Sequence, residues 1–310
     1  MNERAAATSK SRNGIRSAAP SCANPEHDGR FPLNYSMITR RKFLRSTAMT
    51  AMAGALGISY GLMEAKWLRI HEVTLTIPKL PDAFKGKRVA FLADLHHGPY
   101  VPLHYIAHAV DMAQALNPDL ILLGGDYPDR GIPYVEPCIA ELSRLHAPLG
   151  VYAILGNHDH YDGCLPYVKG ALREARIPEL TNRGVWIEDG GARFWLCGVD
   201  DFWRGIQDLP AALGDTTTDD AVLLLSHNPD YVEEINDPRV GLVLSGHTHG
   251  GQINIPVIGA PVVPSLYGQK YVHGLVQGPT VQVFVTRGIG TIIPPIRIAC
   301  RPEIILATLA

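Results

Sequence analysis

The chain has 310 residues, of which 46% are hydrophobic and 19% are charged. Because soluble proteins carry roughly 25% charged residues, this composition predicts a large core and excludes a chain that is disordered throughout. The 28 Lys and Arg residues against 30 Asp and Glu residues give a formal charge of -2, so the basic surface of a nucleic-acid-binding protein is not expected.

The first 36 residues are expected to be disordered, because they are rich in Ser, Ala, Asn and Arg and show no apolar period. Met37 stands immediately ahead of the first patterned segment. We therefore interpret residues 1–36 either as a disordered extension or as a stretch upstream of the true start.

A basic cluster containing Arg40 and Arg41 precedes an uncharged run at 46–63, an order that resembles a twin-arginine export signal. The alternative is an ordinary first helix after a chance arginine pair, but the moderate hydrophobicity of the run favours the signal. Residues 37–65 are expected to be this signal, either cleaved or kept as a membrane anchor, with the twin-arginine translocase as a partner. Charge before the apolar run places everything after Glu64 outside the cytoplasm, in the periplasm or anchored to the membrane and facing outward.

From His71 onward the sequence predicts repeated units of strand, helix and strand. Period-two alternation predicts the first strand, and short apolar runs predict buried strands after it. The expected strands are 71–77, 88–94, 119–123 and 150–155, and the expected helices are 102–116 and 135–145.

After Pro178 the predicted strands follow one another closely and helices become sparse. Strands are expected at 185–188, 193–199, 221–225, 241–244, 281–286 and 303–309. This pattern predicts an α/β fold in which two β-sheets pack face to face with helices outside, an α/β/β/α sandwich. No linker-like stretch divides residues 66–310, so they are expected to form one catalytic domain.

Polar motifs follow five of the predicted apolar runs, at the carboxyl end of each strand. They supply the candidate site residues Asp94, His96, Asp126, Asn157, His158, Asp159, His227, His247 and His249. In open α/β sheets ligands bind outside the carboxyl ends of the strands, so these side chains are expected to converge although they are far apart in sequence.

The donor types in this set indicate a two-metal centre. Carboxylate, amide and imidazole groups without thiolate suit divalent Mn, Fe, Zn or Co, and a bridging carboxylate holds two ions about 3.5 to 4 Å apart. Singly, each motif has a simpler explanation: Asp126 as a turn residue, Asn157 as a turn former and His227 as a core histidine. Five motifs in series favour the metal centre.

The motifs occur in the order D-x-H, G-D, G-N-H-D, H and G-H-x-H. In this order they resemble the calcineurin-like metallophosphoesterases, and more closely a branch of twin-arginine-signalled bacterial phosphodiesterases. The stretches that carry the closer resemblance are 92–96, 120–126, 227–230, 246–252 and 300–303. The resemblance extends from the signal to the C-terminus.

The resemblance implies a role for each matching position. The first metal would be held by Asp94, His96 and His249. The second would be held by Asn157, His227 and His247, with Asp126 bridging both. His158 would lie beside the scissile phosphate, with Asp159 as its orienting partner.

These roles imply hydrolysis without a covalent enzyme intermediate. Two divalent ions lower the pKa of a bridging water, so that hydroxide attacks phosphorus in line with the leaving group. A protonated His158 would neutralise charge on the phosphoryl group or on the leaving oxygen. The expected substrate is a small-molecule or lipid-linked phosphodiester, and no nucleic acid is expected as a partner.

Three alternatives stay open. One is hydrolysis of UDP-2,3-diacylglucosamine in lipid A metabolism, and another is a phosphomonoesterase or nucleotidase with different pocket walls. The third is a non-catalytic metal-binding scaffold, which the presence of every ligand and of His158 disfavours.

Four further residues are kept out of the site. Arg287 and Arg297 lie in Gly-rich and Pro-rich loops, where a solvated charge is the expected state. Trp203 is expected in the core, and His97 as either a pocket wall or surface.

Overall fold

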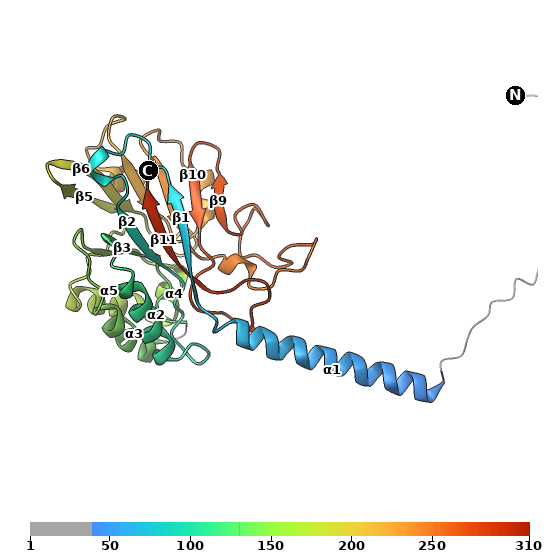
Figure 1. The fold of residues 1–310 in the computed structure, drawn as a ribbon. Helices are drawn as coiled ribbons and strands as arrows, with labels where there is room; N and C mark the ends of the chain where they lie inside the picture. The colour runs from blue at the N-terminus through green and yellow to red at the C-terminus, as the bar shows by residue number, and fades with distance from the viewer. Residues whose placement is uncertain (1–38, 130) are drawn as a thin grey trace, which may run out of the picture. The chain divides into compact units, whose positions relative to one another are not determined.

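A computed structural model describes residues 39–129 and 131–310 (Figure 1). The predictions for residues 1–36 and for a start at Met37 lie outside the described residues. Contacts divide the chain into two units that meet between Ala48 and Met49, and every strand belongs to the second unit.

Helix α1 (Arg40–Glu64) contains the whole uncharged run, in agreement with its content of the helix formers Ala, Met and Leu. Among the residues described, no helix is both long and apolar enough to cross a membrane. At the end of α1 the buried Glu64 carboxylate accepts the backbone N–H groups of Ala299 at 3.1 Å and Cys300 at 2.6 Å.

The first sheet has the strand order β1-β11-β2-β3-β4. Its strands are β1 (Arg69–Leu75), β2 (Arg88–Leu92), β3 (Leu120–Leu123), β4 (Val151–Ala153) and β11 (Glu303–Leu309). Strands β2, β3 and β4 are parallel neighbours, whereas β11 runs antiparallel to β2. All of β3 is buried, which explains its apolar sequence without alternation.

The second sheet has the order β5-β6-β7-β8-β10-β9. Its strands are β5 (Arg183–Asp189), β6 (Ala192–Gly198), β7 (Val222–Leu225), β8 (Leu242–Ser245), β9 (Gly274–Gln277) and β10 (Gln282–Val285). The four central strands are parallel, and β5 and β9 are antiparallel edges.

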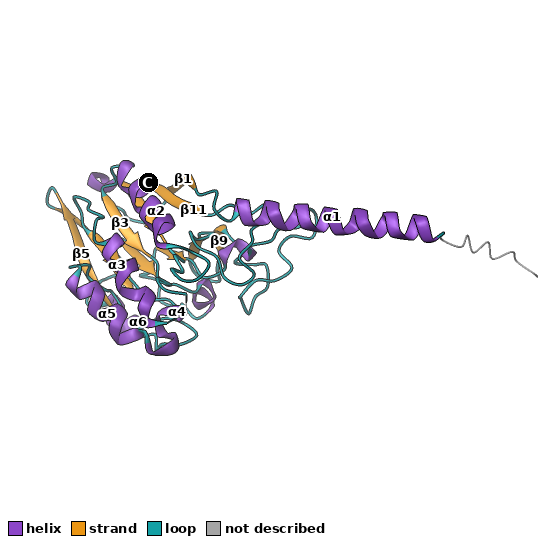
Figure 2. Cartoon of the chain, turned by 90° about the horizontal axis from the view of Figure 1, so that it is seen from below, coloured by secondary structure: helices purple, strands orange, loops and turns teal. Residues whose placement is uncertain are grey.

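The two sheets pack on each other through apolar side chains such as Phe91 of β2, Phe194 of β6 and Phe284 of β10. Helices cover the outer faces, as Figure 2 shows for the strands beside α2, α3 and α5. The helices are α2 (Leu103–Ala115), α3 (Val135–Leu142), α4 (Asn157–His160), α5 (Leu165–Glu174) and α6 (Leu209–Leu213). Short 3-10 segments are η1 (Asp82–Phe84), η2 (Ile132–Tyr134), η3 (Tyr161–Gly163), η4 (Pro229–Glu233) and η5 (His249–Gly251). The predicted α/β/β/α sandwich is confirmed.

Candidate active site

The predicted ligands lie directly after five strands, at the carboxyl ends where they were expected. The strands β2, β3, β4, β7 and β8 are followed by Asp94 and His96, Asp126, Asn157, His227, and His247 and His249, in that order. All of these side chains are buried. Topology therefore brings together residues that are far apart in the sequence.

Several of these residues have a backbone conformation that non-glycine residues rarely adopt. Positive φ angles occur at Asp94 (57°), His96 (50°), Asp126 (59°), His247 (70°) and His249 (52°). Such conformations cost about 1–3 kcal/mol each and persist where the surrounding structure enforces them, typically at functional sites. The strand-to-loop turns are thus shaped to direct these side chains.

Three groups of three side chains bring their ligand atoms within 4.8 Å of one another. One of them contains His96, Asp129 and His158, and the other two, called the first and second clusters below, consist of predicted ligands. The first contains Asp94, His96 and His249, and the second contains Asp126, His227 and His247. Within the first cluster, the Nε2 atoms of His96 and His249 are 3.0 Å apart, and Asp94 Oδ1 is 3.6 Å from His249 Nε2. These two clusters contain six of the seven residues that the sequence predicts as metal ligands, all except Asn157.

Asp126 belongs to the second cluster and also reaches the first. Its Oδ2 atom is 3.5 Å from His96 Nε2 and 3.1 Å from His227 Nε2. Its Oδ1 atom accepts the backbone N–H of His158 at 2.7 Å. One oxygen therefore faces both clusters, which is the geometry that a bridging ligand requires.

The residues fit a pair of divalent cations. Asp94 Oδ2, Asn157 Oδ1 and His247 Nε2 are buried and have no hydrogen-bond partner among the described residues. A buried polar atom without a partner costs about 1–3 kcal/mol, so several of them in one cluster indicate a site for a ligand. Oxygen and imidazole donors suit borderline divalent metals.

The protonation states agree with this assignment. Burial lowers the pKa of His96 and of His247 to about 3, so both rings carry free lone pairs at neutral pH, as metal ligands must. His227 differs: burial opposes its charge, but Asp126 and Asp94 raise the pKa of His227 to about 10. Metal binding at His227 therefore displaces a proton.

His158 lies at the edge of the clusters, with a side chain that is 20% exposed. Its Nδ1 atom is 2.9 Å from the carbonyl oxygen of Asp129 and 3.4 Å from Asp129 Oδ1. Burial alone would lower the pKa of His158, but the charge of Asp126 and the contacts with Asp129 raise it to about 9. The carboxylates around the ring therefore favour its protonated form, and part of the ring is accessible from solvent.

The predicted pairing of His158 with Asp159 is wrong. The buried Asp159 carboxylate accepts the backbone N–H groups of Gly156 at 2.8 Å, Asp126 at 2.8 Å and Tyr127 at 3.0 Å. It turns back to cap the start of α4, as an acidic residue in the first turn of a helix commonly does. Asp159 thus fixes the loop that carries Asp126.

Sequence reasoning missed two residues beside the site. Asp129 takes the orienting position beside His158, and its only signal in the sequence is its place three residues after Asp126. Trp203, expected in the core, is 40% exposed, and its ring centroid is 4.3 Å from that of His247 in an edge-on contact. Trp203 therefore forms part of the wall above the second cluster.

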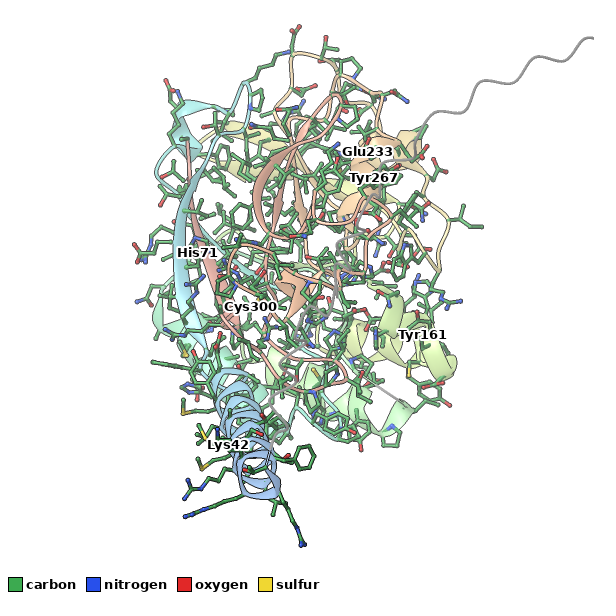
Figure 3. All side chains as sticks on the ribbon, turned by 90° about the vertical axis from the view of Figure 1, so that its right-hand side faces the viewer. Lys42, His71, Tyr161, Glu233, Tyr267 and Cys300 are labelled. Carbon is green, nitrogen blue, oxygen red and sulfur yellow. The ribbon has the colours of Figure 1, made fainter. Side chains whose placement is uncertain are left out.

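The two loop arginines are not solvated charges, so that expectation is wrong. Arg297 is fully buried and donates to the carbonyl oxygens of Cys300 at 3.2 Å and His249 at 3.4 Å. Arg287 donates to Glu303 Oε2 at 3.1 Å. Cys300, labelled in Figure 3, is buried with Sγ 3.2 Å from the carbonyl oxygen of His249. This network holds the backbone of His249 in place.

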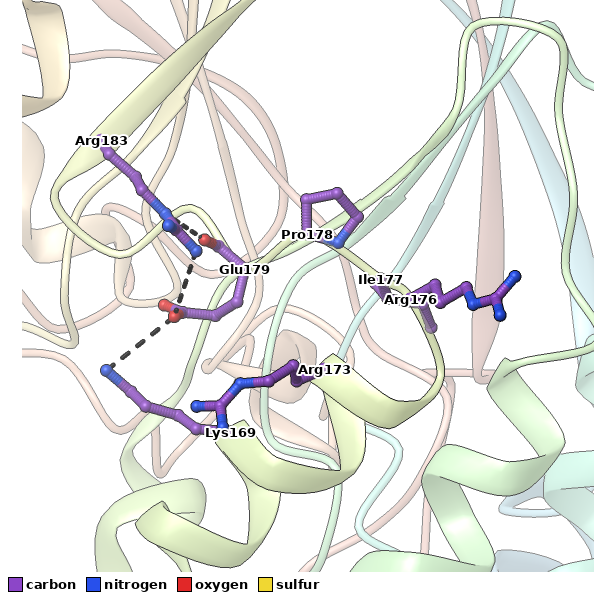
Figure 4. Close-up of a pocket in the computed structure, with 7 residues that line it drawn as sticks. All are labelled: Lys169, Arg173, Arg176, Ile177, Pro178, Glu179 and Arg183. Carbon is purple, nitrogen blue, oxygen red and sulfur yellow. Dashed lines mark hydrogen bonds and ion pairs between the residues drawn. The ribbon is translucent and has the colours of Figure 1, made fainter.

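A separate hollow of about 390 Å³ lies on the protein surface (Figure 4). Basic side chains surround it, and Glu179 Oε2 lies 3.9 Å from Lys169 Nζ and 3.8 Å from Arg183 Nη2. None of the predicted site residues lines this hollow. It plays no part in the metal centre.

Two packed sheets with Asp, Asn and His side chains gathered at their strand ends define an α/β protein with a candidate metal centre. The chain belongs to the calcineurin-like phosphoesterase family, which residues 87–251 match. This span contains all seven predicted metal ligands, so the predicted family is confirmed.

Three relatives place the chain within this family. It is 35% identical over 277 residues to phosphodiesterase YaeI of Escherichia coli (strain K12), a match that covers 88% of this chain and 100% of YaeI. It is 31% identical over 281 residues to the uncharacterized metallophosphoesterase YkuE of Bacillus subtilis (strain 168), with 88% and 98% covered. A transmembrane protein with metallophosphoesterase domain from Danio rerio is 30% identical over 274 residues, with 84% and 62% covered.

Proposed function

We propose that the protein is a phosphodiester hydrolase that depends on two divalent cations. The observation that carries this proposal is the position of Asp126 Oδ2, 3.5 Å from His96 Nε2 and 3.1 Å from His227 Nε2. The similarity to a relative named as a phosphodiesterase favours diesters over monoesters as substrates.

The chain's own residues would hold the two cations as the sequence motifs suggest. Asp94, His96 and His249 would bind one ion, and Asn157, His227 and His247 the other, with Asp126 shared. When bound, the ions would hold the phosphate oxygens and supply hydroxide at neutral pH for in-line attack on phosphorus.

His158 would act on the substrate rather than on a metal. Its Nδ1–H donates to the carbonyl oxygen of Asp129, which leaves the opposite ring nitrogen, Nε2, for the substrate. A protonated Nε2 donates a hydrogen bond, and then a proton, to the leaving oxygen as the bond to phosphorus breaks. Asp129 orients the ring and keeps it cationic.

A substrate panel tests this function. Protein loaded with Mn²⁺ or Zn²⁺ is assayed with bis-p-nitrophenyl phosphate, p-nitrophenyl phosphate and a nucleoside monophosphate. The proposal expects the highest kcat/KM for the diester. A preference for either monoester would replace it with the phosphomonoesterase or nucleotidase alternative, and no turnover of any ester would favour a scaffold.

We also propose that the protein is exported through the twin-arginine translocase and acts outside the cytoplasm. The support is the order of Arg40, Arg41 and the uncharged run that forms most of α1. Folded proteins use this pathway, so the metal centre would be assembled before export.

A further inference from the structure

An apolar pocket of about 240 Å³ opens beside the first metal cluster. It reaches His249, a member of that cluster. The rest of its wall is mostly aliphatic, with side chains that include Ile253, Pro261, Val262, Ile292 and Ile293. A ligand in this pocket would meet a metal-binding residue at one end and hydrocarbon along its length.

The two segments that form the pocket carry no charge. Residues 250–269 and 288–296 contain no Asp, Glu, Lys, Arg or His. The cations that flank these segments are already engaged: Lys270 lies 2.5 Å from Glu233, Arg287 donates to Glu303, and Arg297 donates to the carbonyl oxygen of Cys300. Such walls cannot compensate a charged or strongly polar group, so the part of a ligand that enters must be apolar.

The pocket is held open by hydrogen bonds from buried polar side chains. Gln252, which is 6% exposed, donates to the carbonyl oxygen of Ile292 at 3.3 Å and accepts the N–H of the same residue at 2.8 Å. The buried Asp230 carboxylate accepts Ser265 Oγ–H at 2.6 Å and the N–H of Leu266 at 2.7 Å. Gln252 therefore fixes the wall at Ile292, and Asp230 fixes the chain directly after Pro264, which lines the pocket.

Val262 and Ile293, which line the pocket, are exposed, and further exposed apolar side chains lie in the same chain segment as Val262. We call this set the apolar rim: Ile255 (40% exposed), Val257 (108%), Ile258 (62%), Val262 (75%), Leu266 (75%) and Ile293 (53%). Most of it comes from the long segment between β8 and β9, drawn in orange in Figure 1, and Tyr267 of the same segment is labelled in Figure 3. Contiguous exposed apolar residues of this kind mark a surface that contacts an apolar ligand.

We propose that the apolar pocket binds the hydrocarbon portion of an amphiphilic phosphodiester whose phosphate lies at the adjoining metal centre. This inference rests on the proposed function and names its substrate class. His249 connects the two sites, because it lines the pocket and belongs to the first cluster. The volume of about 240 Å³ lies below the roughly 300–1,000 Å³ of pockets that enclose a whole ligand, so the pocket holds one hydrocarbon segment.

The proposal predicts how activity depends on the length of the substrate's alkyl chain. Each methylene transferred from water to an apolar site strengthens binding about fourfold when fully buried. A series of methyl, butyl and octyl p-nitrophenyl phosphodiesters, used as monomers in solution, measures this gain. We expect kcat/KM of the metal-loaded protein to rise at least tenfold from the methyl to the octyl ester.

Two variants test whether the chain-length dependence of kcat/KM arises in the pocket. Val262→Asp and Ile293→Asp each introduce a charge at an exposed lining position, so the fold tolerates them better than a core change. We expect the ratio of kcat/KM for octyl over methyl ester to fall toward one in both. Tyr167→Asp is the matched control, since Tyr167 of α5 is 52% exposed and does not line this pocket. It should keep the wild-type ratio.

Binding without turnover gives a second readout. Calorimetry with octylphosphonate and methylphosphonate should show tighter binding of the octyl compound, with a more negative heat-capacity change, and Val262→Asp should abolish the difference. Equal kcat/KM for methyl and octyl esters would overturn this inference while the hydrolase function stands. If binding depends on chain length but no ester is hydrolysed, the proposed hydrolase function is wrong, while binding of hydrocarbon in the pocket stands. If kcat/KM rises with chain length only in phosphatidylcholine vesicles, and Val262→Asp does not change that rise, the pocket does not bind the hydrocarbon.

Discussion

At the scale of single residues, His158 has a role distinct from that of the metal ligands around it. Its side chain is 20% exposed, and its Nδ1 atom lies 2.9 Å from the carbonyl oxygen of Asp129. His158 also lies near His96 of the first cluster, so its loss must be tested against loss of metal. His158→Ala should keep its metals but lose about a hundredfold or more in turnover, the usual effect of removing a positioned acid.

Elemental analysis of the purified variant, with its rate on bis-p-nitrophenyl phosphate, checks this prediction. His247→Ala is the matched comparison, because His247 belongs to the second cluster and its loss should remove metal as well as activity. If His158→Ala loses metal to the same extent as His247→Ala, His158 is a ligand and the assignment is wrong.

Asp129 should set the alkaline limit of activity. The charge of Asp126 and the contacts with Asp129 raise the pKa of His158 to about 9 against the effect of burial, so the protonated ring prevails below that pH and is lost as the pH rises through it. Asp129→Asn removes one of these charges, so activity should begin to fall at lower pH.

Bound cations would lower the pKa of His158 in both proteins, and the prediction is therefore the difference between them. The pH dependence of kcat/KM on a soluble diester measures it. If kcat/KM falls at the same alkaline pH in wild type and in Asp129→Asn, Asp129 does not raise the pKa of His158.

Sequence motifs predicted the ligands but not their neighbours. The ligands follow apolar strands, and parallel strands end at a common edge, so convergence follows from topology. The partner of His158 depends on the turn after Asp126, whose φ is 59°, and no local pattern predicts which nearby carboxylate such a turn presents. The burial of Arg297 likewise depends on carbonyl groups of a loop whose course is fixed only by the folded core.

At the scale of elements, Glu303 stabilises the pairing of β1 with β11. It is the first residue of β11 and lies opposite Arg69 in the parallel register, with Arg69 Nη2 donating to its Oε2 at 2.7 Å. Burial opposes its charge, but the hydrogen bond from Arg69 and the charge of Arg287 hold the pKa of Glu303 below its ordinary value of 4.5. This pairing joins the outer strand to the sheet.

Glu303→Gln should lower the free energy of unfolding by about 1–3 kcal/mol at pH 7, because it weakens the charge-assisted hydrogen bonds that Arg69 and Arg287 donate to a buried carboxylate. A carboxylate with a lowered pKa stabilises the fold above its unfolded-state pKa, and that contribution is lost as the pH falls through the folded-state pKa. The difference from wild type should therefore shrink as the pH falls below the ordinary pKa value of 4.5.

Urea unfolding at pH 7 and at low pH gives this difference. Glu72→Gln on β1, an exposed position, is the matched control and should change stability little. A Glu303→Gln effect that is the same at pH 7 and at low pH would mean that its charge does not stabilise the strand pair.

Strands with an apolar run or a clear alternation were predicted, whereas a short edge strand and a short amphipathic helix were not. Strand β3 reads LILL and is wholly buried, whereas the unpredicted β9 alternates between half-buried and exposed residues at the sheet edge. Helix α5 was missed although Pro166 stands in its first turn and Val168 and Leu172, four residues apart, are buried. Its short amphipathic pattern was the available signal.

At the scale of the whole molecule, the arrangement of Arg40 and Arg41 ahead of the uncharged run predicts export. Replacing both arginines with lysine keeps the charge but removes the guanidinium pair that the translocase reads. The double variant should therefore remain in the cytoplasm.

Fractionation of cells that contain a twin-arginine translocase measures the distribution of the protein. Arg45→Lys is the control, because it makes the same substitution outside the pair and should leave export intact. Export of the double variant at the wild-type rate would show that no twin-arginine signal operates here.

The central claim, a two-cation phosphodiester hydrolase, depends most on the negative charge of Asp126 between two positive ions. The most direct test is to titrate chelator-treated protein with Mn²⁺ while measuring bound metal per chain and hydrolysis of bis-p-nitrophenyl phosphate. Wild type should reach full activity at two ions per chain. Asp126→Asn should bind neither ion tightly and remain inactive, whereas Asp119→Asn, at the opposite end of β3, should behave as wild type. Hydrolysis by the metal-free chain, or two bound ions with wild-type activity in Asp126→Asn, would contradict the claim.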